Sequence, residues 1–294
     1  MRIGISANPH KPLAVDLARR AAERLKSDAE VVLTDETARL VDLGLAHAPL
    51  PELTAEVLLA IGGDGTFLYT LQRSSVPLLP INAGTVGFLA EVDGANLPAF
   101  DGALERLLRG LYFIESRMKL ASQIDGENLD DATNEVVVHT SQVAKMRLFE
   151  IAIDGRAVGR LRADGVILAT ATGSTSYSLS ALGPILDPSV EGIVVSALAP
   201  FQSTQRAVVV DPLRTVRIRL VHPEKEGVVV IDGQSERKLP GGGSVTVYRS
   251  SRKAEFLRFG SRFFRRLQGK RILPWAEELG EAESTDDAVF PPPP

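Results

Sequence analysis

Hydrophobic positions in the first third of the chain form short apolar runs, separated by segments with helical spacing. The runs have the length of buried strands and cover residues 2–6, 30–33, 57–61 and 76–81. Between the first two runs, one helix face is formed by Leu13, Leu17, Ala18, Ala21 and Leu25. Further helices are expected from Thr66 and over residues 97–111, where Gly110 ends the pattern. This alternation predicts an α/β domain with a parallel sheet and crossover helices.

Beyond about Tyr112 the pattern changes to a succession of strands. Apolar and polar residues alternate over residues 149–154 and 216–220, and further apolar runs cover residues 166–169, 193–197, 207–210 and 228–231. Such short, regularly punctuated segments are typical of antiparallel sheets with one buried face. We therefore predict a C-terminal β-rich domain that is antiparallel and sandwich-like.

Four segments follow from these patterns. The α/β domain is expected over residues 1–111 and the β-rich domain over residues 112–259. Residues 260–279 are expected to contain a C-terminal helix that returns to the first domain, with Arg262, Arg265 and Arg266 on its solvent-exposed face. Residues 280–294 are acidic and then proline-rich, which predicts a disordered tail.

Composition and charge narrow the class of protein. A hydrophobic content of 44% and a charged content of 24% are ordinary for a soluble globular protein. The net charge of -4 argues against a general nucleic-acid binder. Because the sequence contains no cysteine, no disulfide is expected. The apolar run over residues 1–6 is too short for a signal peptide, and no apolar run approaches the length of a membrane span. A cytoplasmic protein with neither nucleic acid nor membrane as partner is expected.

Residues 62–66, with the sequence GGDGT, lie between an apolar run and an expected helix. A strand that leads through glycines into a helix N-terminus can bind phosphate, because the backbone N–H groups are free and the helix end is partly positive. The turn fits neither a P-loop nor the usual dinucleotide fingerprint. A carboxylate repels phosphate, so Asp64 points to a chemical role, either as a base facing a hydroxyl or as a metal contact. A ligand-free turn is the alternative interpretation.

Further polar motifs follow or precede the later strands. Residues 82–89 (NAGTVGFL) form a second glycine-containing strand end, which could face Asp64 because neighbouring parallel strands end at the same edge. Residues 134–135 (NE) could bind an adenine edge or ribose hydroxyls. Residues 162–165 (RADG), 172–178 (TGSTSYS) and 232–234 (DGQ) flank other strands. Taken singly, each motif is also explained as a loop, a helix cap or a hairpin turn. The His count is 4, and these residues are scattered without metal-ligand spacing, so no zinc site is expected.

In this order the motifs resemble the NAD kinase family. The match covers residues 62–66, 82–89 with Glu91, 134–135, 162–165, 172–180 with 183–185, and 232–234, and it extends to about Leu267. The resemblance implies transfer of the γ-phosphoryl group of ATP to the 2′-hydroxyl of the adenosine ribose of NAD, which gives NADP. It also implies a divalent cation, usually Mg²⁺, and a homodimer or homotetramer, and it assigns no metal ligands.

The resemblance also implies roles for individual residues. Asp64 is implied as the general base. Phosphate binding is implied for Gly62, Gly63, Gly65 and Thr66. Contacts to NAD are implied for Asp64, Gly65, Phe88, Asn134, Glu135, Lys145, Arg162, Asp164, Thr172, Thr175, Ser176, Tyr177, Ser180 and Gln234. Two positions depart from the family pattern: Ala163 lies where Ser is frequent, and Leu182 replaces a common Gly.

Two other functions compete with this one. A lipid kinase of the diacylglycerol type shares the glycine-rich Asp turn, but its Asn-Glu pair usually follows almost directly, where this chain has Phe67-Leu68-Tyr69. A nucleotide-binding sensor that has lost catalysis would carry a neutral residue in place of Asp64. The residues leave open whether inorganic polyphosphate replaces ATP and whether NADH is accepted beside NAD.

Overall fold

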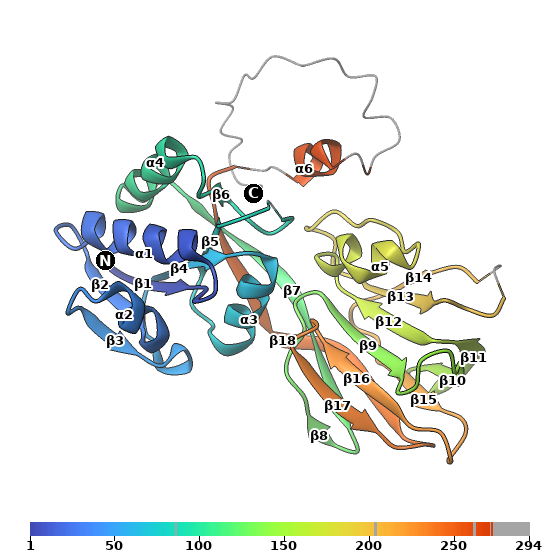
Figure 1. Cartoon of the computed structure of the whole chain (residues 1–294). Coiled ribbons are helices and arrows are strands. Elements are labelled where there is room, and N and C mark those ends of the chain that lie inside the picture. Colours follow the sequence, from blue (N-terminus) through green and yellow to red (C-terminus); the bar gives the residue numbers. More distant parts are fainter. Residues whose placement is uncertain (86, 203–204, 261–262, 271, 273–294) are drawn as a thin grey trace. The chain divides into compact units, whose positions relative to one another are not determined.

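The computed structural model describes residues 1–85, 87–202, 205–260, 263–270 and 272, which divide into two compact units (Figure 1). Unit 1 comprises Met1–Phe67, Val76–Glu115 and the described residues from Phe256 onward. Unit 2 comprises Leu68–Ser75 and Ser116–Glu255. The tail that we predict to be disordered, residues 280–294, lies outside the described residues.

Unit 1 is built on a mostly parallel sheet with helices, as the alternating pattern predicts. Its strands pair in the order β18-β5-β4-β1-β2-β3, where β18 is Ser244–Arg258, and β6 pairs with β5. The elements that lie in or begin in this unit are β1 (Arg2–Ala7), α1 (Pro12–Leu25), β2 (Glu30–Thr34), α2 (Asp35–Val41), β3 (Ala46–Ala48), the 3₁₀ helix η1 (Leu50–Glu52), β4 (Val57–Gly62), α3 (Asp64–Arg73), β5 (Leu78–Asn82), β6 (Val92–Asp93), α4 (Leu97–Leu108), β7 (Phe113–Ile124) and α6 (Phe263–Gly269).

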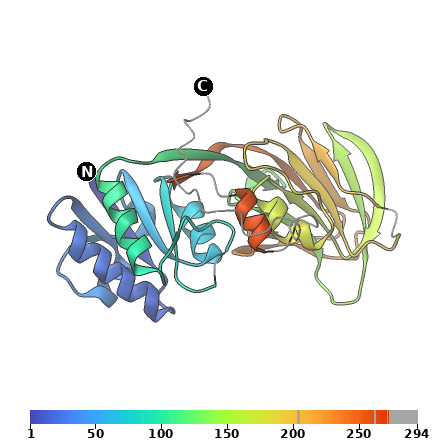
Figure 2. The ribbon, with the colours of Figure 1, turned by 90° about the horizontal axis from the view of Figure 1, so that it is seen from above.

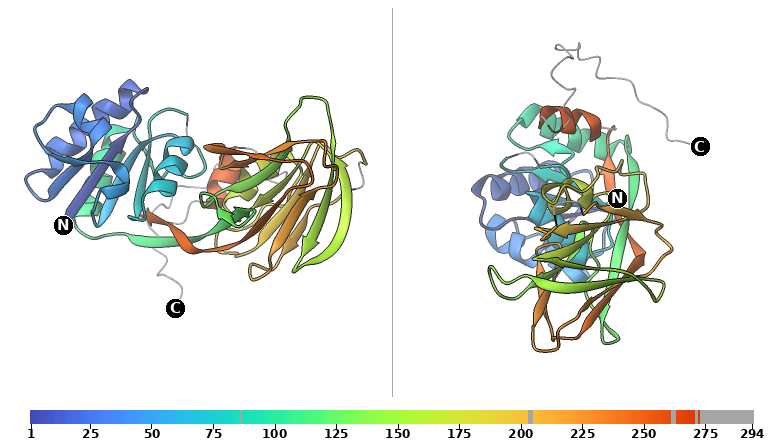
Figure 3. Two further views of the ribbon diagram at one scale, coloured as in Figure 1. Left: turned by 90° about the horizontal axis from the view of Figure 1, so that it is seen from below. Right: turned by 90° about the vertical axis from the view of Figure 1, so that its right-hand side faces the viewer.

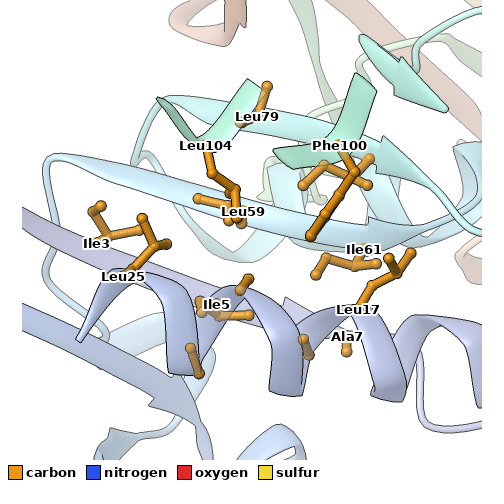
Figure 4. Packing of buried hydrophobic residues seen from close by; sticks show 14 of the residues in the cluster. Ile3, Ile5, Ala7, Leu17, Leu25, Leu59, Ile61, Leu79, Phe100 and Leu104 are labelled. Carbon is orange, nitrogen blue, oxygen red and sulfur yellow. The ribbon is translucent and has the colours of Figure 1, made fainter. Parts of the chain in front are cut away.

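The core of unit 1 lies between the sheet and helices α1 and α4. Side chains of alternate strand residues point to this face, among them Ile5 of β1 and Leu59 of β4, where they meet Leu17 of α1 and Phe100 of α4 (Figure 4). Figure 2 shows the two helices side by side. Burial of each such side chain is worth roughly 1.5–3 kcal/mol, so the helices are held mainly by this apolar face.

Unit 2 consists of antiparallel sheets, again as predicted. One sheet has the strand order β14-β13-β12-β9-β16-β17, and the second contains β11-β10-β15-β18, with β7 paired to β18 and β8. The elements are β8 (Glu127–Asn128), β9 (Glu135–Thr140), β10 (Arg147–Ile153), β11 (Arg156–Ala163), β12 (Gly165–Ala169), the 3₁₀ helix η2 (Gly173–Thr175), α5 (Tyr177–Ser180), β13 (Ile193–Leu198), β14 (Val208–Val210), β15 (Val216–Leu220), β16 (Gly227–Ile231), β17 (Ser235–Leu239) and β18 (Ser244–Arg258), whose last residues belong to unit 1.

The two sheets of unit 2 pack face to face around a single apolar cluster (Figure 3). Val136 and Val166 contribute to it from one sheet, and Phe149, Ile218 and Val245 from the other. This is the sandwich-like arrangement expected from the alternating pattern. Among the described residues, no helix is both long and apolar enough to cross a membrane.

The C-terminal helix departs from its expected environment. Arg265 is exposed, but the Arg266 side chain is only 15% exposed. Arg266 donates from Nη1 to the carbonyl of Phe88 at 2.8 Å, and its Nη2 lies 3.5 Å from Glu91 Oε2. The prediction of a solvated face is therefore wrong for Arg266, because a carboxylate distant in sequence draws the guanidinium inward. Arg262 lies outside the described residues.

Candidate active site

The GGDGT motif forms a tight turn between β4 and α3. Gly62 ends the strand, and a Cβ at this position would lie 2.3 Å from Thr66 Oγ1, so no larger residue fits. Thr66 Oγ1 accepts hydrogen bonds from the backbone N of Gly63 at 3.4 Å and from Asn8 Nδ2 at 3.0 Å. The turn is thus closed by its own threonine and fixed to the residues that follow β1.

Asp64 is the first residue of α3, and backbone amides hold its carboxylate. Oδ2 accepts a hydrogen bond from the N–H of Phe88 at 2.8 Å, and Oδ1 accepts one from Leu89 at 3.3 Å. A Cβ at Gly87 would lie 2.0 Å from Asp64 Oδ1, so glycine is required for this approach. The second glycine-containing strand end therefore does face Asp64, as its place in the parallel sheet predicts.

A buried ionic network binds the carbonyl groups of Phe88 and Leu89, the residues whose amides contact Asp64. Arg258 Nη1 donates to the carbonyl of Leu89 at 2.9 Å and lies 3.2 Å from Glu91 Oε2, while Arg266 donates to the carbonyl of Phe88. The Glu91 side chain is 1% exposed and that of Arg258 is 4% exposed. The amides that orient Asp64 are therefore fixed from both sides by charge-assisted hydrogen bonds.

In unit 2, Asn134 and Glu135 lie at the start of β9, beside a buried carboxylate. Asp232 accepts three backbone hydrogen bonds: Oδ2 from Thr133 at 2.8 Å, and Oδ1 from Asn134 at 2.8 Å and from Glu135 at 3.0 Å. Asp232 has a left-handed φ of 51° and begins the tight turn between β16 and β17. We predict the turn from the sequence but not the role of Asp232, since an Asp-Gly pair is explained equally well by the turn alone.

The carboxyl of Glu135 is protonated far more readily than an ordinary glutamate. Burial, and then the nearby charge of Asp232, raise its pKa from 4.5 to about 8, while hydrogen bonds from Ser176 and the backbone of Tyr177 oppose the rise. Ser176 Oγ donates to Glu135 Oε1 at 3.2 Å. Burial also raises the pKa of Asp232, and its three amide donors oppose this. The amides favour charge on Asp232, so Glu135 is the carboxyl that is more readily protonated.

The hydroxyl-rich segment after β12 lies beside Asn134. A Cβ at Gly173 would come within 2.1 Å of the Asn134 carbonyl, so the close approach requires glycine. Thr172 is buried, Thr175 donates to the Thr172 carbonyl at 3.1 Å, and Tyr177 is exposed. Ser180, the last residue of α5, is exposed as well. Asn134, Glu135, Thr172, Thr175, Ser176 and Tyr177 are therefore brought together.

Other implied residues lie apart from this group within unit 2. Lys145 and Asp164 accept hydrogen bonds through their carbonyls from Thr140, the last residue of β9, whereas Asn134 directly precedes its first residue. At about 3.3 Å per residue, the two ends of β9 are roughly 16 Å apart. Arg162 lies near the end of β11, two residues before Asp164, and its guanidinium is 5.7 Å from the ring centre of Phe201. Gln234 is exposed in the turn after Asp232.

Comparison with known proteins identifies the family. Residues 42–112 match the family described as ATP-NAD kinase N-terminal domain, and residues 133–259 match the ATP-NAD kinase C-terminal domain. The NAD kinase of Methanopyrus kandleri is 41% identical over 281 residues, which cover 93% of this chain and 98% of that protein. The chain belongs to the NAD kinase family. The NAD kinase of Thermoplasma volcanium is 40% identical over 256 residues, covering 87% and 92% of the two chains.

Solved structures agree with this assignment. The structure of the Archaeoglobus fulgidus NAD kinase in complex with ATP has a TM-score of 0.74 and 28% identity, and the match covers 95% of this chain and 100% of that one. Yeast NADH kinase complexed with NADH has a TM-score of 0.84 at 21% identity, covers 96% and 90% of the two chains, and supports the fold alone. The activity is that of an NAD kinase, a phosphotransferase, which decides against the lipid kinase and the silent sensor.

Proposed function

We propose that this NAD kinase transfers the γ-phosphoryl group of ATP to the 2′-hydroxyl of the adenosine ribose of NAD, and that Asp64 is the general base. The observation that carries the proposal is a carboxylate at the first residue of α3, inside a glycine turn, with both oxygens oriented by the amides of Phe88 and Leu89. ATP as donor is supported by the related Archaeoglobus fulgidus NAD kinase, whose structure is a complex with ATP.

In the proposed reaction Asp64 accepts the proton of the ribose 2′-hydroxyl as that oxygen attacks the γ-phosphorus. The P–O bond to the β-phosphate breaks, and ADP leaves with that bond's electron pair. General-base assistance of this kind contributes roughly 10²–10⁴-fold in rate. Phosphate oxygens are proposed to bind at the turn, to the N–H group of Gly65 and beside Gly62, Gly63 and Thr66.

The polar group of unit 2 is proposed to bind NAD. Asn134 Oδ1 and Glu135 Oε2 are buried and accept no hydrogen bond from the described residues, which supports a polar ligand at this place. A protonated Glu135 would donate to a ribose or base acceptor, and Tyr177 offers an exposed ring face. Further contacts to NAD are proposed for Gly65, Phe88, Lys145, Arg162, Asp164, Thr172, Thr175, Ser176, Ser180 and Gln234.

Mg²⁺ is proposed to arrive with the nucleotide. Across the part of the chain that the structure describes, no group of three or more His, Cys, Asp or Glu side chains is arranged to hold a metal. The only carboxylate of the turn is Asp64, and this donor set fits an ion whose ligands come mostly from substrate phosphates and water. When bound, Mg²⁺ neutralises negative charge on the phosphates.

The family resemblance further supports a homodimer or homotetramer, and we place the protein in the cytoplasm. Light scattering coupled to size exclusion would measure the oligomeric state, and a mass equal to that of one chain would contradict the first proposal. Fractionation of cells that express the chain would test the second.

The proposed reaction is tested with purified protein, ATP, Mg²⁺ and NAD, with NADP measured by an NADP-specific dehydrogenase. We expect NADP from the wild type and a roughly 10²–10⁴-fold lower kcat for Asp64→Asn, with NAD affinity retained. Asp16→Asn, at an exposed position of α1, is the matched control and should turn over normally. Normal turnover by Asp64→Asn would exclude the base role, whereas a lipid product without NADP would exclude the reaction itself.

A further inference from the structure

A cation lies beside the glycine turn, on a loop outside the motifs discussed above. Lys11 follows β1, which pairs in parallel with β4 through Ala7 and Ile61, so the loops after both strands lie at the same edge of the sheet. Its ammonium Nζ lies 3.3 Å from the position that a Cβ would take at Gly63, and 3.0 Å from that position at Gly84. Lys11 is therefore placed where the loops after three neighbouring strands meet.

The backbone of this loop is fixed to the glycine turn. Asn8 donates through its backbone N to the Ile61 carbonyl at 2.9 Å and through Nδ2 to Thr66 Oγ1 at 3.0 Å. The backbone N of Lys11 donates to the Asn8 carbonyl at 3.2 Å, and Pro12 then starts α1. The backbone from which the lysine side chain extends is thus preorganised. Only the torsions of its four methylenes remain free to rotate.

The ammonium has no anionic partner within the described ranges. Lys11 forms neither an ion pair nor a side-chain hydrogen bond there, and the carboxylate of the turn, Asp64, is held by the amides of Phe88 and Leu89. The turn is also the N-terminus of α3, a ten-residue helix whose first N–H groups carry partial positive charge. A lysine beside a helix N-terminus is electrostatically unfavourable, and a bound anion would offset this cost in addition to Asp64.

Glycine at residues 63 and 84 lets the Lys11 ammonium approach the backbone of both loops. A side chain at residue 63 or 84 would crowd the ammonium, and Gly84 has a φ of +152° that other residues rarely adopt. Asn82, which is fully buried, donates from Nδ2 to the Gly84 carbonyl and holds this backbone in place. Backbone N–H groups of a helix N-terminus and a cation beside them are the elements of a phosphate site.

We propose that Lys11 Nζ donates hydrogen bonds to the phosphate oxygens of the nucleotide bound at the glycine turn. This rests on the proposed function of the turn and adds a residue to it. The triphosphate of ATP and the diphosphate of NAD offer the same chemistry, so separate measurements for the two nucleotides must assign the source. Loss of a charged hydrogen bond to a phosphate should weaken binding by roughly 10- to 100-fold.

The test compares Lys11→Met with Lys11→Arg and with Lys26→Met. Lys26 is an exposed lysine directly after the end of α1, the helix that Lys11 precedes, and serves as the control. We expect Lys11→Met to raise KM for ATP roughly 10- to 100-fold, Lys11→Arg to recover most of the loss, and Lys26→Met to behave as wild type. Calorimetric titration with inorganic tripolyphosphate should show the same loss for Lys11→Met, whereas the inhibition constant of adenosine should stay unchanged.

The outcomes separate the two proposals. A rise in KM for NAD alone would support phosphate binding by Lys11 and assign it to the dinucleotide. Unchanged KM values for both nucleotides, with unchanged tripolyphosphate affinity, would overturn the role of Lys11 while leaving the NAD kinase reaction in place. If the wild type made no NADP, the proposed reaction would fail, and the tripolyphosphate titration would still decide on Lys11. An equal loss of adenosine binding would also count against the proposal, because it indicates structural damage.

Discussion

Replacement of Glu135 by glutamine should change how the stability of the protein depends on pH. Glu135 is buried beside Asp232, and its pKa is raised from 4.5 to about 8, first by burial and second by that charge. A carboxyl whose pKa is higher in the folded state binds its proton more tightly there than in the unfolded chain. Its contribution to stability is therefore fully present below pH 4.5 and is lost as the pH rises towards 8. The glutamine side chain of the variant would mimic the protonated form at every pH.

The size of the effect follows from the two pKa values. At 1.36 kcal/mol per pKa unit, the full difference is worth roughly 4–5 kcal/mol. Between pH 6 and pH 9 the wild type should lose roughly 2–3 kcal/mol through this carboxyl. Glutamine does not titrate, so the Glu135→Gln variant does not lose this stability. The free energy of unfolding of the variant minus that of the wild type should therefore increase by roughly 2–3 kcal/mol from pH 6 to pH 9.

Urea unfolding followed by circular dichroism at constant ionic strength measures this difference. Glu150→Gln is the control: hydrogen bonds from Arg219 and Arg160 lower the pKa of Glu150, so the carboxylate stays ionised from pH 6 to pH 9. Its stability difference from the wild type should be flat over that range. A flat difference for Glu135→Gln as well would refute the reasoning, because Glu135 would then be ionised in the folded protein at pH 6.

Two further substitutions test other features of unit 2. In Asp232→Asn an amide N–H₂ faces backbone N–H donors that the carboxylate satisfies in the wild type. The free energy of unfolding, measured with urea at pH 7, should fall by roughly 2–4 kcal/mol. Stability equal to the wild type would contradict that role. Leu182 has a left-handed φ of 57° and is 91% exposed, so Leu182→Gly should relieve about 1–2 kcal/mol of backbone strain against an entropy cost of about 0.5–1 kcal/mol. A net gain of roughly 0.5–1 kcal/mol should appear as a melting temperature about 2 °C higher, and a lower one would refute this estimate.

Strands with a distinct apolar face are predictable from the sequence, and strands at the sheet edges are not. The alternation of Phe149, Ile151 and Ile153 identifies β10 because one face of that strand is buried. β11 and β17 show little such alternation, since most of their side chains are exposed at the edges of their sheets. The long β18 is also missed, because its burial pattern is irregular along its length.

The candidate site shows the same division. The position of Asp64 in a glycine turn and its proximity to residues 87–89 follow from strand order in a parallel sheet, which the alternating pattern indicates. The partners of Arg266 and the position of Lys11 do not follow, because each is brought to the site by contacts between segments distant in sequence. Arg266 meets Phe88 across 178 residues, and the loop of Lys11 is fixed through Asn8 to Thr66 across 58 residues.

By itself the sequence determines the two kinds of sheet, the glycine turn with its carboxylate, and the ordered motifs typical of an NAD kinase. These depend on local periodicity and on residue types that are read along the chain. Only the tertiary structure decides that Asp232 accepts the amides before and within β9, that burial raises the pKa of Glu135, and that Lys11 lies beside the turn. The physical reason is that burial, charge and hydrogen-bond partners are set by neighbours in space, and folding brings these together from segments that carry no mutual signal in the sequence.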